Sequence, residues 1–348
     1  MKVGQLSEII IGDCLDVLAG MPGASIDCVV TSPPYWGLRN YDVVARHWSE
    51  IEYIPMIGLP SVRIPAEIVC VGQESSALAF VGHLVAVFRE VARVMKPTGT
   101  AWVNLGDTYA AEARDRRIEH VTATSSLTGG YSSQIACLKQ PGTAGEIPRK
   151  NLCGIPWRVA LALQADGWIL RSDIIWSKTN PMPESVTDRP TKAHEYVLMF
   201  SRQQKYYYDH EAGATPASTT RLAASNFAVV KKETTRRVQQ FREDRPATLP
   251  QKMKNRRDVW SISSEAYPGA HYAVMPSALA EICIQCGCPQ DGIVLDPFAG
   301  AGTTLYSAEQ LQRHSIGIDL NPESEEQIRI RMTAGKRSFM TTRSGTLL

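Results

Sequence analysis

Two adjacent prolines between a hydroxyl and an aromatic side chain stand out as a segment suited to chemistry. Residues 31–36 read TSPPYW and directly follow the apolar run IDCVV. The prolines fix the backbone and remove two N–H donors, which leaves the carbonyls of Ser32 and Pro33 free as acceptors. Tyr35 adds a flat ring that can stack on a base. This loop is therefore suited to holding a planar amino group, although a purely structural Pro-Pro turn explains the segment equally well by itself.

The chemistry that such a loop favours is transfer to an exocyclic amino nitrogen. The lone pair of that nitrogen is delocalised into the base ring, so the nitrogen is a poor nucleophile. Hydrogen bonds from both N–H groups to fixed acceptors would draw the nitrogen toward a tetrahedral shape and localise the lone pair. Proximity and orientation then let it attack an electrophilic carbon in line.

A second segment, residues 293–304, reads IVLDPFAGAGTT. It predicts a strand that ends at Asp296, a turn of small residues, and a helix from about Thr303. Gly300 and Gly302 let the backbone approach a ligand closely, and the helix start offers free N–H groups. About twenty residues later the run SIGID ends in Asp319, an acid placed to accept hydrogen bonds from ribose hydroxyls. The third glycine of GxGxxG is missing, which favours a single-nucleoside cofactor over a dinucleotide.

Strands and helices alternate along the chain, which indicates an open α/β sheet that positions both segments. A run at 168–176 and another at 195–200 resemble a late hairpin. Helical patterns occupy 83–95 and 156–165. The predicted parallel strands are 9–11, 26–31, 100–105, 293–296 and 315–319.

The composition is that of an ordinary globular protein, with 44% hydrophobic residues and a formal net charge of +2 over 348 residues. No apolar run is long enough for a membrane span and no signal peptide is visible, so we expect a cytoplasmic protein. The eight cysteines fit reduced thiols. Cys283, Cys286 and Cys288 lack an obvious fourth ligand, so we expect core packing and no metal.

Two segments interrupt the pattern. Residues 107–150 are polar and without clear periodicity. Residues 211–258 hold eleven Lys or Arg residues against five acids, so positive charge is concentrated there. Such clustering is typical of phosphate contact, although a solvated charged loop has the same composition.

TSPPY and DPFAGAGTT together resemble the motifs of the DNA methyltransferases that modify the N4 of cytosine or the N6 of adenine. The order, with the catalytic motif first, resembles the permuted beta group of that family, and the resemblance covers most of the chain. It implies S-adenosyl-L-methionine as the cofactor, double-stranded DNA as the substrate, base flipping, and association with the nucleoid in the cytoplasm. A cognate restriction endonuclease is a further possible partner, and monomer and homodimer both stay open.

The resemblance also assigns roles to individual residues. Gly12-Asp13-Cys14 resembles a segment that lines the cofactor adenine, and HYAVMP at 271–276 one near its methionine end. WSKTNPMP at 176–183 resembles a loop close to the flipped base. The implied catalytic residues are Ser32, Pro33, Pro34 and Tyr35. The implied cofactor-binding residues are Asp13, Cys14, His271, Asp296, Phe298, Gly300, Gly302, Thr303, Asp319 and Asn321. We expect Lys178, Arg236, Arg237, Arg256 and Arg257 to contact DNA.

The implied fold is a Rossmann-like, seven-stranded α/β sheet with one antiparallel strand and an inserted target-recognition region. Residues 1–210 form the catalytic half, with insertions at about 42–76 and 107–150 whose roles stay open, DNA contact being one. Residues 211–258 form the target-recognition region, 259–335 the cofactor-binding half, and 336–348 a C-terminal tail.

Other classes fit less well. Protein glutamine and RNA methyltransferases usually start the loop with Asn and place it after the glycine motif. A DNA-binding protein without catalysis would be expected to have lost Ser32, Tyr35 or the glycine turn. A cytosine ring-carbon methyltransferase needs a cysteine nucleophile, usually after proline, and no Pro-Cys pair occurs. Among the resembling enzymes a leading serine more often accompanies cytosine, so we expect cytosine, with adenine as the alternative.

Overall fold

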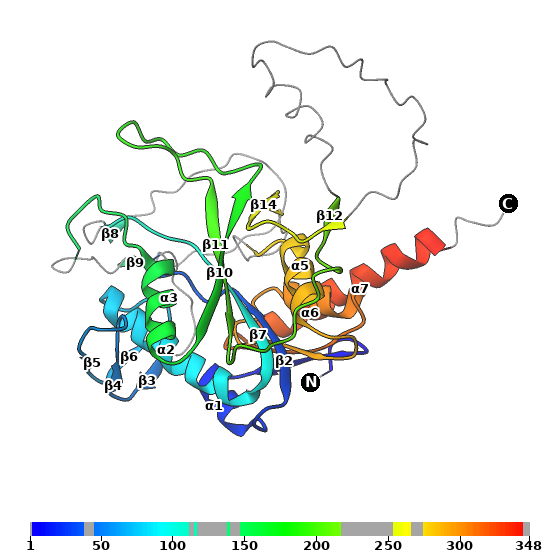
Figure 1. Cartoon of the computed structure of the whole chain (residues 1–348), viewed down its shortest axis with the longest axis horizontal. Helices are drawn as coiled ribbons and strands as arrows, with labels where there is room; N and C mark the ends of the chain where they lie inside the picture. The colour runs from blue at the N-terminus through cyan, green and yellow to red at the C-terminus, as the bar shows by residue number, and fades with distance from the viewer. Residues whose placement is uncertain are drawn as a thin grey trace, which may run out of the picture.

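An eight-stranded mixed sheet forms the centre of the molecule (Figure 1). The computed structural model describes residues 2–37, 45–110, 115–116, 138–139, 147–216, 253–265 and 274–343. Strand β11 runs antiparallel to both of its neighbours, β7 and β10, whereas all other neighbouring pairs in this sheet are parallel. The strands in spatial order are β1 (Ser7–Ile11), β16 (His314–Asp319), β15 (Ile293–Asp296), β2 (Ile26–Thr31), β7 (Met95–Leu105), β11 (His194–Ser201), β10 (Ile169–Lys178) and β14 (Val259–Ile262).

This topology confirms the predicted Rossmann-like sheet with one antiparallel strand, and it adds one strand to the predicted seven. The extra strand is β14, which extends the sheet beyond β10 through the pairs Ile175–Val259 and Lys178–Ile262. It lies at the edge next to the β10–β11 hairpin, on the far side from β1 and β16. Its sequence, VWSI, is too short and too alternating to stand out as a buried parallel strand.

Helices cover both faces of the sheet (Figure 1). On one face lie α1 (Cys14–Gly20), α2 (Ala77–Val94) and α3 (Ile155–Ala165). On the other face lie α5 (Ser277–Gly287) and α6 (Thr303–Gln310), with α7 (Glu323–Arg343) packed beside α6. Helix α7 continues to Arg343, into the segment predicted as a tail. No helix in the described ranges is long and apolar enough to cross a membrane.

Helix α2 begins earlier than the predicted residue 83. Ser76 is its N-cap, with Oγ accepting from the backbone N–H of Ala79 at 3.0 Å. The first turns read ALAFVG and are almost wholly buried, so they show no single apolar face from which a helix could be predicted. The burial arises because α2 lies between the sheet and the described part of the 42–76 insertion.

That insertion folds as two nested antiparallel pairs. Strand β3 (Arg46–Trp48) pairs with β6 (Glu67–Val69), and β4 (Ile51–Tyr53) pairs with β5 (Val62–Ile64). The Tyr53 hydroxyl donates to the carbonyl of Leu78 in α2 at 2.9 Å. The nested pairs therefore pack against α2 and support it.

Two further short antiparallel pairs lie outside the main sheet. They are β8 (Asp115–Arg116) with β9 (Leu138–Lys139), and β12 (Thr215–Pro216) with β13 (Met253–Lys254).

Candidate active site

The two motifs meet at one edge of the sheet. Strand β2 ends at Thr31, the next strand β15 ends at Asp296, and β16 ends at Asp319. The three strands are parallel neighbours, so their carboxyl ends lie side by side, where open α/β sheets bind ligands. The loops that follow them carry TSPPY and DPFAGAG, which lie 265 positions apart in the chain at Thr31 and Asp296.

Asp296 is buried between the two loops. Its Oδ1 accepts from the Thr31 hydroxyl at 2.6 Å and from the backbone N–H of Phe298 at 3.1 Å. Burial raises the pKa of this carboxyl to about 6, against the lowering effect of these hydrogen bonds. The predicted cofactor residue Asp296 therefore also supports the base of the TSPPYW loop at 31–36, the predicted catalytic loop, and the side chain of Phe298 beside it is half-buried.

Asp319 organises the glycine turn. Its Oδ2 accepts from the backbone N–H of Gly300 at 2.8 Å. Its Oδ1 accepts from the N–H of Asn321 at 2.9 Å and from the hydroxyl of Ser324 at 2.8 Å. The ends of β15 and β16 are thus locked together, and the Asn321 side chain accepts from the N–H of Glu323 at the start of α7.

The two glycines of the turn differ in the space around them: there is open space beside Gly300 but not beside Gly302. Gly300 has φ +50°, and a Cβ there would meet nothing closer than the Phe298 carbonyl at 3.9 Å. Gly302 has φ +73° and precedes α6, and a Cβ there would come within 2.7 Å of Ile328. Gly302 therefore serves packing, whereas Gly300 faces open space that a ligand can occupy. Thr303 is buried and its hydroxyl accepts from Arg331 at 2.9 Å.

Asp13 and Cys14 lie beside this turn at the end of β1. The N–H of Gly12 donates to the carbonyl of Asp319 at 2.9 Å, which brings the segment next to β16. Asp13 caps α1 and pairs with Arg46 from the insertion. Burial raises the pKa of the Cys14 thiol to about 12, so this cysteine is a neutral packing residue next to the site.

Hydrogen bonds join the predicted catalytic loop to the end of the 42–76 insertion. The Trp36 indole donates to the carbonyl of Glu74 at 2.9 Å, and the N–H of Gly37 donates to that of Gly72 at 2.8 Å. The Glu74 carboxylate accepts from the N–H of Gly72 at 2.8 Å and contacts His83 Nδ1 at 2.9 Å. The side chains of Glu74 and His83 are fully buried, and burial raises the pKa of Glu74. Pro33 is buried and Pro34 half-buried, so the loop has little freedom to move.

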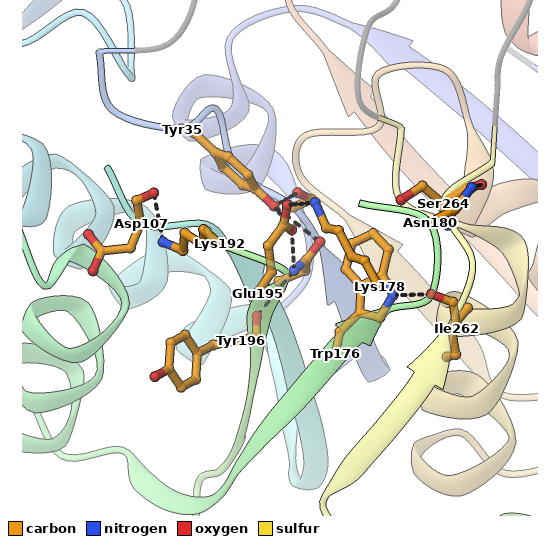
Figure 2. Close-up of polar contacts among 12 residues, drawn as sticks. Tyr35, Asp107, Trp176, Lys178, Asn180, Lys192, Glu195, Tyr196, Ile262 and Ser264 are labelled. Atoms are coloured by element: carbon orange, nitrogen blue, oxygen red, sulfur yellow. Dashed lines mark hydrogen bonds and ion pairs between the residues drawn. The ribbon is translucent and has the colours of Figure 1, made fainter. Parts of the chain in front are cut away.

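Tyr35 is the centre of a polar cluster (Figure 2). Its hydroxyl donates to Glu195 Oε2 at 2.6 Å and also lies 3.2 Å from Asn104 Oδ1. Asn104 Nδ2 donates to the same Glu195 oxygen at 3.1 Å, and the Ser32 hydroxyl lies 3.5 Å from the Tyr35 oxygen. The ring of Tyr35 lies against Gly106, where a Cβ would come within 2.6 Å.

The sequence did not single out Glu195 or Asn104. Glu195 stands near the start of β11, and Asn104 near the end of β7. Each lies beside an apolar run of its strand, AWV before Asn104 and YVLMF after Glu195, and the signal was the polar residue itself next to that run. The antiparallel pairing of β11 with β7, through Tyr196 and Leu105, brings both side chains to the site.

Lys178 belongs to this cluster. Its ammonium pairs with Glu195 Oε1 and lies over the ring of Trp176, 4.7 Å from the centroid. The Trp176 indole donates to the carbonyl of Ile262 in β14 at 2.9 Å, which fixes the end of β10 (Figure 2). Lys178 therefore lies among the predicted catalytic residues, where its charge is balanced by Glu195.

Of the other predicted DNA contacts, the structure describes Arg256 and Arg257. Arg256 is half-buried, donates to the carbonyl of Gly213 at 3.1 Å, and lies over Trp260. Arg257 is exposed. Arg236, Arg237 and the predicted cofactor residue His271 lie outside the described residues.

The three clustered cysteines pack in the core. Cys283, Cys286 and Cys288 are all buried, at α5 and its C-cap, among apolar side chains such as Ile284 and Val294. Burial raises the pKa of each thiol, to about 12 for Cys288. Within the described ranges, no three His, Cys, Asp or Glu side chains are grouped as a metal site.

Comparison with known proteins identifies the family. A family model described as DNA methylase matches residues 26–329. The type II methyltransferase M.SmaI of Serratia marcescens is 37% identical over 316 residues, which is 91% of this chain and 87% of that protein. M.Cfr9I of Citrobacter freundii is 37% identical over 312 residues, covering 90% of this chain and 83% of that protein.

Solved structures show the same fold. The PvuII cytosine-N4-specific DNA methyltransferase superposes with a TM-score of 0.57 at 18% identity, covering 94% of this chain and 86% of that one. A putative DNA modification methylase of Thermus thermophilus, crystallised with S-adenosyl-L-methionine, gives a TM-score of 0.52 at 22% identity, covering 94% of this chain and 93% of that one.

The chain belongs to the N4/N6 family of DNA methyltransferases. This confirms the predicted family, and with it S-adenosyl-L-methionine as the cofactor. The enzyme is a site-specific DNA methyltransferase of the restriction-modification type, and its catalytic motif precedes its cofactor motif in the chain.

Proposed function

We propose that the enzyme methylates the N4 amino group of cytosine in duplex DNA, after flipping the base out of the helix. The observation that carries the proposal is the cluster of Ser32, Tyr35 and Glu195 at the end of β2, where Thr31 bonds to Asp296 just before the glycine turn. Ser32 heads the catalytic loop, and in the family a leading serine more often accompanies cytosine than adenine. The similarity to the PvuII enzyme, whose name specifies cytosine N4, is consistent with this choice of base.

The residues that would hold the cofactor are Asp13, Asp319, Asn321, Gly300 and Phe298, at the ends of β1, β15 and β16. The open space beside Gly300 fits a ligand that lies close to the backbone, since a Cβ there would project into it. When bound, S-adenosyl-L-methionine supplies a methyl carbon bonded to a sulfonium, which is the electrophile. We propose that Asp319 accepts from ribose hydroxyls while it continues to hold the N–H of Gly300.

The target amino group is held by the catalytic loop in this proposal. The Ser32 hydroxyl and the carbonyls at Ser32 and Pro33 accept its two hydrogens, and the Tyr35 ring stacks on the base. The amino nitrogen would then attack the methyl carbon in line, so that the N–C bond forms as the carbon–sulfur bond breaks and a neutral thioether is left. The methylated nitrogen would release one proton to solvent. The hydrogen bond between Thr31 and Asp296 fixes the distance between the two loops, which is the positioning that in-line transfer requires.

Adenine N6 is the alternative target. Both bases present an amino group on a six-membered ring, so the acceptors described above serve either. Selectivity depends on the pocket around the rest of the base, for which the loop after Lys178 is the candidate. Trp36, the other residue expected there, is buried behind the Pro-Pro loop and bonded to Glu74.

Duplex contact is proposed for the basic region 211–258, with Arg256 and Arg257 at its described end. A cognate restriction endonuclease stays a prediction.

The target base can be tested directly. Unmodified DNA is incubated with enzyme and cofactor and digested to nucleosides, which are resolved by mass spectrometry. We expect N4-methyl-2′-deoxycytidine. Finding only N6-methyl-2′-deoxyadenosine would overturn the cytosine proposal, and finding no methylated nucleoside would overturn both.

A further inference from the structure

Glu195 occupies an unusual position for a charged residue. It lies near the start of the antiparallel strand β11, is only 9% exposed, and faces the catalytic loop rather than solvent (Figure 2). A buried carboxylate is costly unless each oxygen has a partner. Here Oε1 pairs with the Lys178 ammonium, and Oε2 accepts from both Tyr35 and Asn104. This pattern of donors fits the ionised carboxylate, which can only accept.

The charge of Glu195 sets the direction of the hydrogen bonds in the cluster. A Tyr hydroxyl has one hydrogen, and at 2.6 Å that hydrogen goes to the carboxylate. The oxygen of Tyr35 is then left to accept. The Ser32 hydroxyl lies 3.5 Å away, at the outer limit of a hydrogen bond, and is the donor in that contact.

The same direction then determines what Ser32 can do. With its own hydrogen turned toward Tyr35, Ser32 Oγ presents only lone pairs on its remaining side. Without the carboxylate, the Tyr35 hydrogen would turn to one of the two acceptors that remain, Asn104 Oδ1 at 3.2 Å or Ser32 Oγ at 3.5 Å. In the second case Ser32 Oγ would accept from tyrosine instead of from a base. The negative charge at the end of the chain of hydrogen bonds also makes Ser32 Oγ a stronger acceptor, through polarisation of the intervening hydroxyl.

We propose that Glu195 is a positioning residue for methyl transfer, which orients the Tyr35 hydroxyl so that Ser32 Oγ accepts from the target amino group. Lys178 holds Glu195 in place and balances its charge. This inference rests on the proposed function of Ser32 and Tyr35 as the residues that hold the target base. It assigns a role to the start of β11, which carries no residue of either motif.

The test is a double-mutant cycle between Glu195→Gln and Tyr35→Phe. The rate of a single turnover is measured with labelled S-adenosyl-L-methionine and enzyme in excess over unmodified plasmid DNA. Glu195→Gln keeps the volume and removes the charge, so we expect the rate to fall about 10- to 100-fold. Affinity for the cofactor and for the plasmid should stay within about twofold, because the glutamate contacts neither in this proposal.

The double variant separates positioning from a general effect on the site. If Glu195 acts through the Tyr35 hydroxyl, then Glu195→Gln adds no further loss to Tyr35→Phe. Rate reductions that multiply would overturn the proposal, as would a Glu195→Gln enzyme as fast as wild type. Glu90→Gln is the matched control: this glutamate pairs with Arg93 on α2, away from the cluster, and its variant should keep the wild-type rate.

A second variant covers the case in which Glu195→Gln does not fold, and the activity of the wild type separates the two proposals. Should Glu195→Gln fail to fold, Glu195→Asp replaces it, because the shorter carboxylate keeps the charge beside Lys178 but withdraws from Tyr35. The same loss of rate is then expected, and a wild-type rate would contradict the proposal. If the wild-type enzyme transfers no methyl group to DNA, the proposed function fails. If wild type is active and only the cycle fails, the role of Glu195 alone is wrong.

Discussion

The hydroxyl of Thr31 donates to Asp296 Oδ1 at 2.6 Å, and this buried bond joins the ends of the two strands that precede the motif loops. Thr31 is the last residue of β2, before the catalytic loop, and Asp296 is the last residue of β15, before the glycine turn. Both side chains are buried. Methyl transfer needs the acceptor nitrogen and the methyl donor at a fixed separation, and a buried contact between adjacent strand ends provides a rigid reference for it.

Replacing Asp296 with Asn should change how stability depends on pH. Burial raises the pKa of this carboxyl from 3.8 to about 6, so the folded protein binds a proton that the unfolded chain has released. The contribution of Asp296 to the free energy of unfolding is therefore fully present below about pH 4, and it is lost as the pH rises through about 6. Asn cannot ionise, so Asp296→Asn should equal wild type near pH ~4 and exceed it at pH ~8, by on the order of 2 to 3 kcal/mol. Urea unfolding at both pH values measures this, and a difference that is constant with pH would contradict it.

The two glycines of the cofactor turn should respond differently to substitution. Gly300→Ala adds a methyl group that meets only open space, so we expect cofactor affinity to fall about tenfold or more and stability to change chiefly by the strain of its positive φ. Gly302→Ala drives a methyl group against Ile328 and should cost more stability. Gly300→Val should abolish cofactor binding. Calorimetry and thermal unfolding separate the effects, and unchanged affinity in Gly300→Val would remove the turn from the cofactor site.

Glu74→Ala should destabilise the enzyme strongly. The side chain is fully buried and holds both His83 and the N–H of Gly72, which would be left without this partner in the core. Breaking a buried pair by removing one partner costs about 3 to 5 kcal/mol, which we expect in guanidinium unfolding. Glu90→Ala, which removes a half-buried carboxylate on α2, provides a comparison at about 0.5 kcal/mol or less. A loss as small as that in Glu74→Ala would show that the insertion does not support the catalytic loop.

Neutralising Arg236, Arg237, Arg256 and Arg257 together should weaken duplex binding and flatten its salt dependence, by about 0.9 in slope for each phosphate interaction removed. The structure separates two of these residues. Arg257 is exposed, so Arg257→Ala should act on DNA binding alone, whereas Arg256→Ala also removes the interactions with Gly213 and Trp260 and should lower the unfolding temperature. Titrations at several salt concentrations give the slopes, and an unchanged slope in the fourfold variant would place DNA binding elsewhere.

The parts of the site that could be predicted from the sequence are those formed by consecutive residues. The strand that ends at Asp296, the turn and the start of α6 at Thr303 follow from local rules, and the structure has them where they were expected. The hairpin of β10 and β11 was likewise visible as two apolar runs.

What could not be predicted depends on contacts between distant segments. Glu195 lies 160 positions from Tyr35, and nothing in the run HEYVLMFS indicates which loop its carboxylate faces. Likewise, the apolar first turns of α2 showed no face because the nested strands of the insertion cover the side that would otherwise be polar. A DNA contact was expected of Lys178 as a basic residue near the flipped base, and its pairing with Glu195 became visible only in three dimensions.

The short pair β12–β13 has a consequence for how such an enzyme could acquire a new target sequence. Thr215 pairs with Lys254 and Pro216 with Met253, so the two ends of the segment between them lie side by side. A segment joined in this way can be lengthened, shortened or exchanged without moving any strand of the main sheet. If the residues that recognise the target sequence lie between these two strands, related enzymes could exchange that segment and keep the methyl-transfer site unchanged.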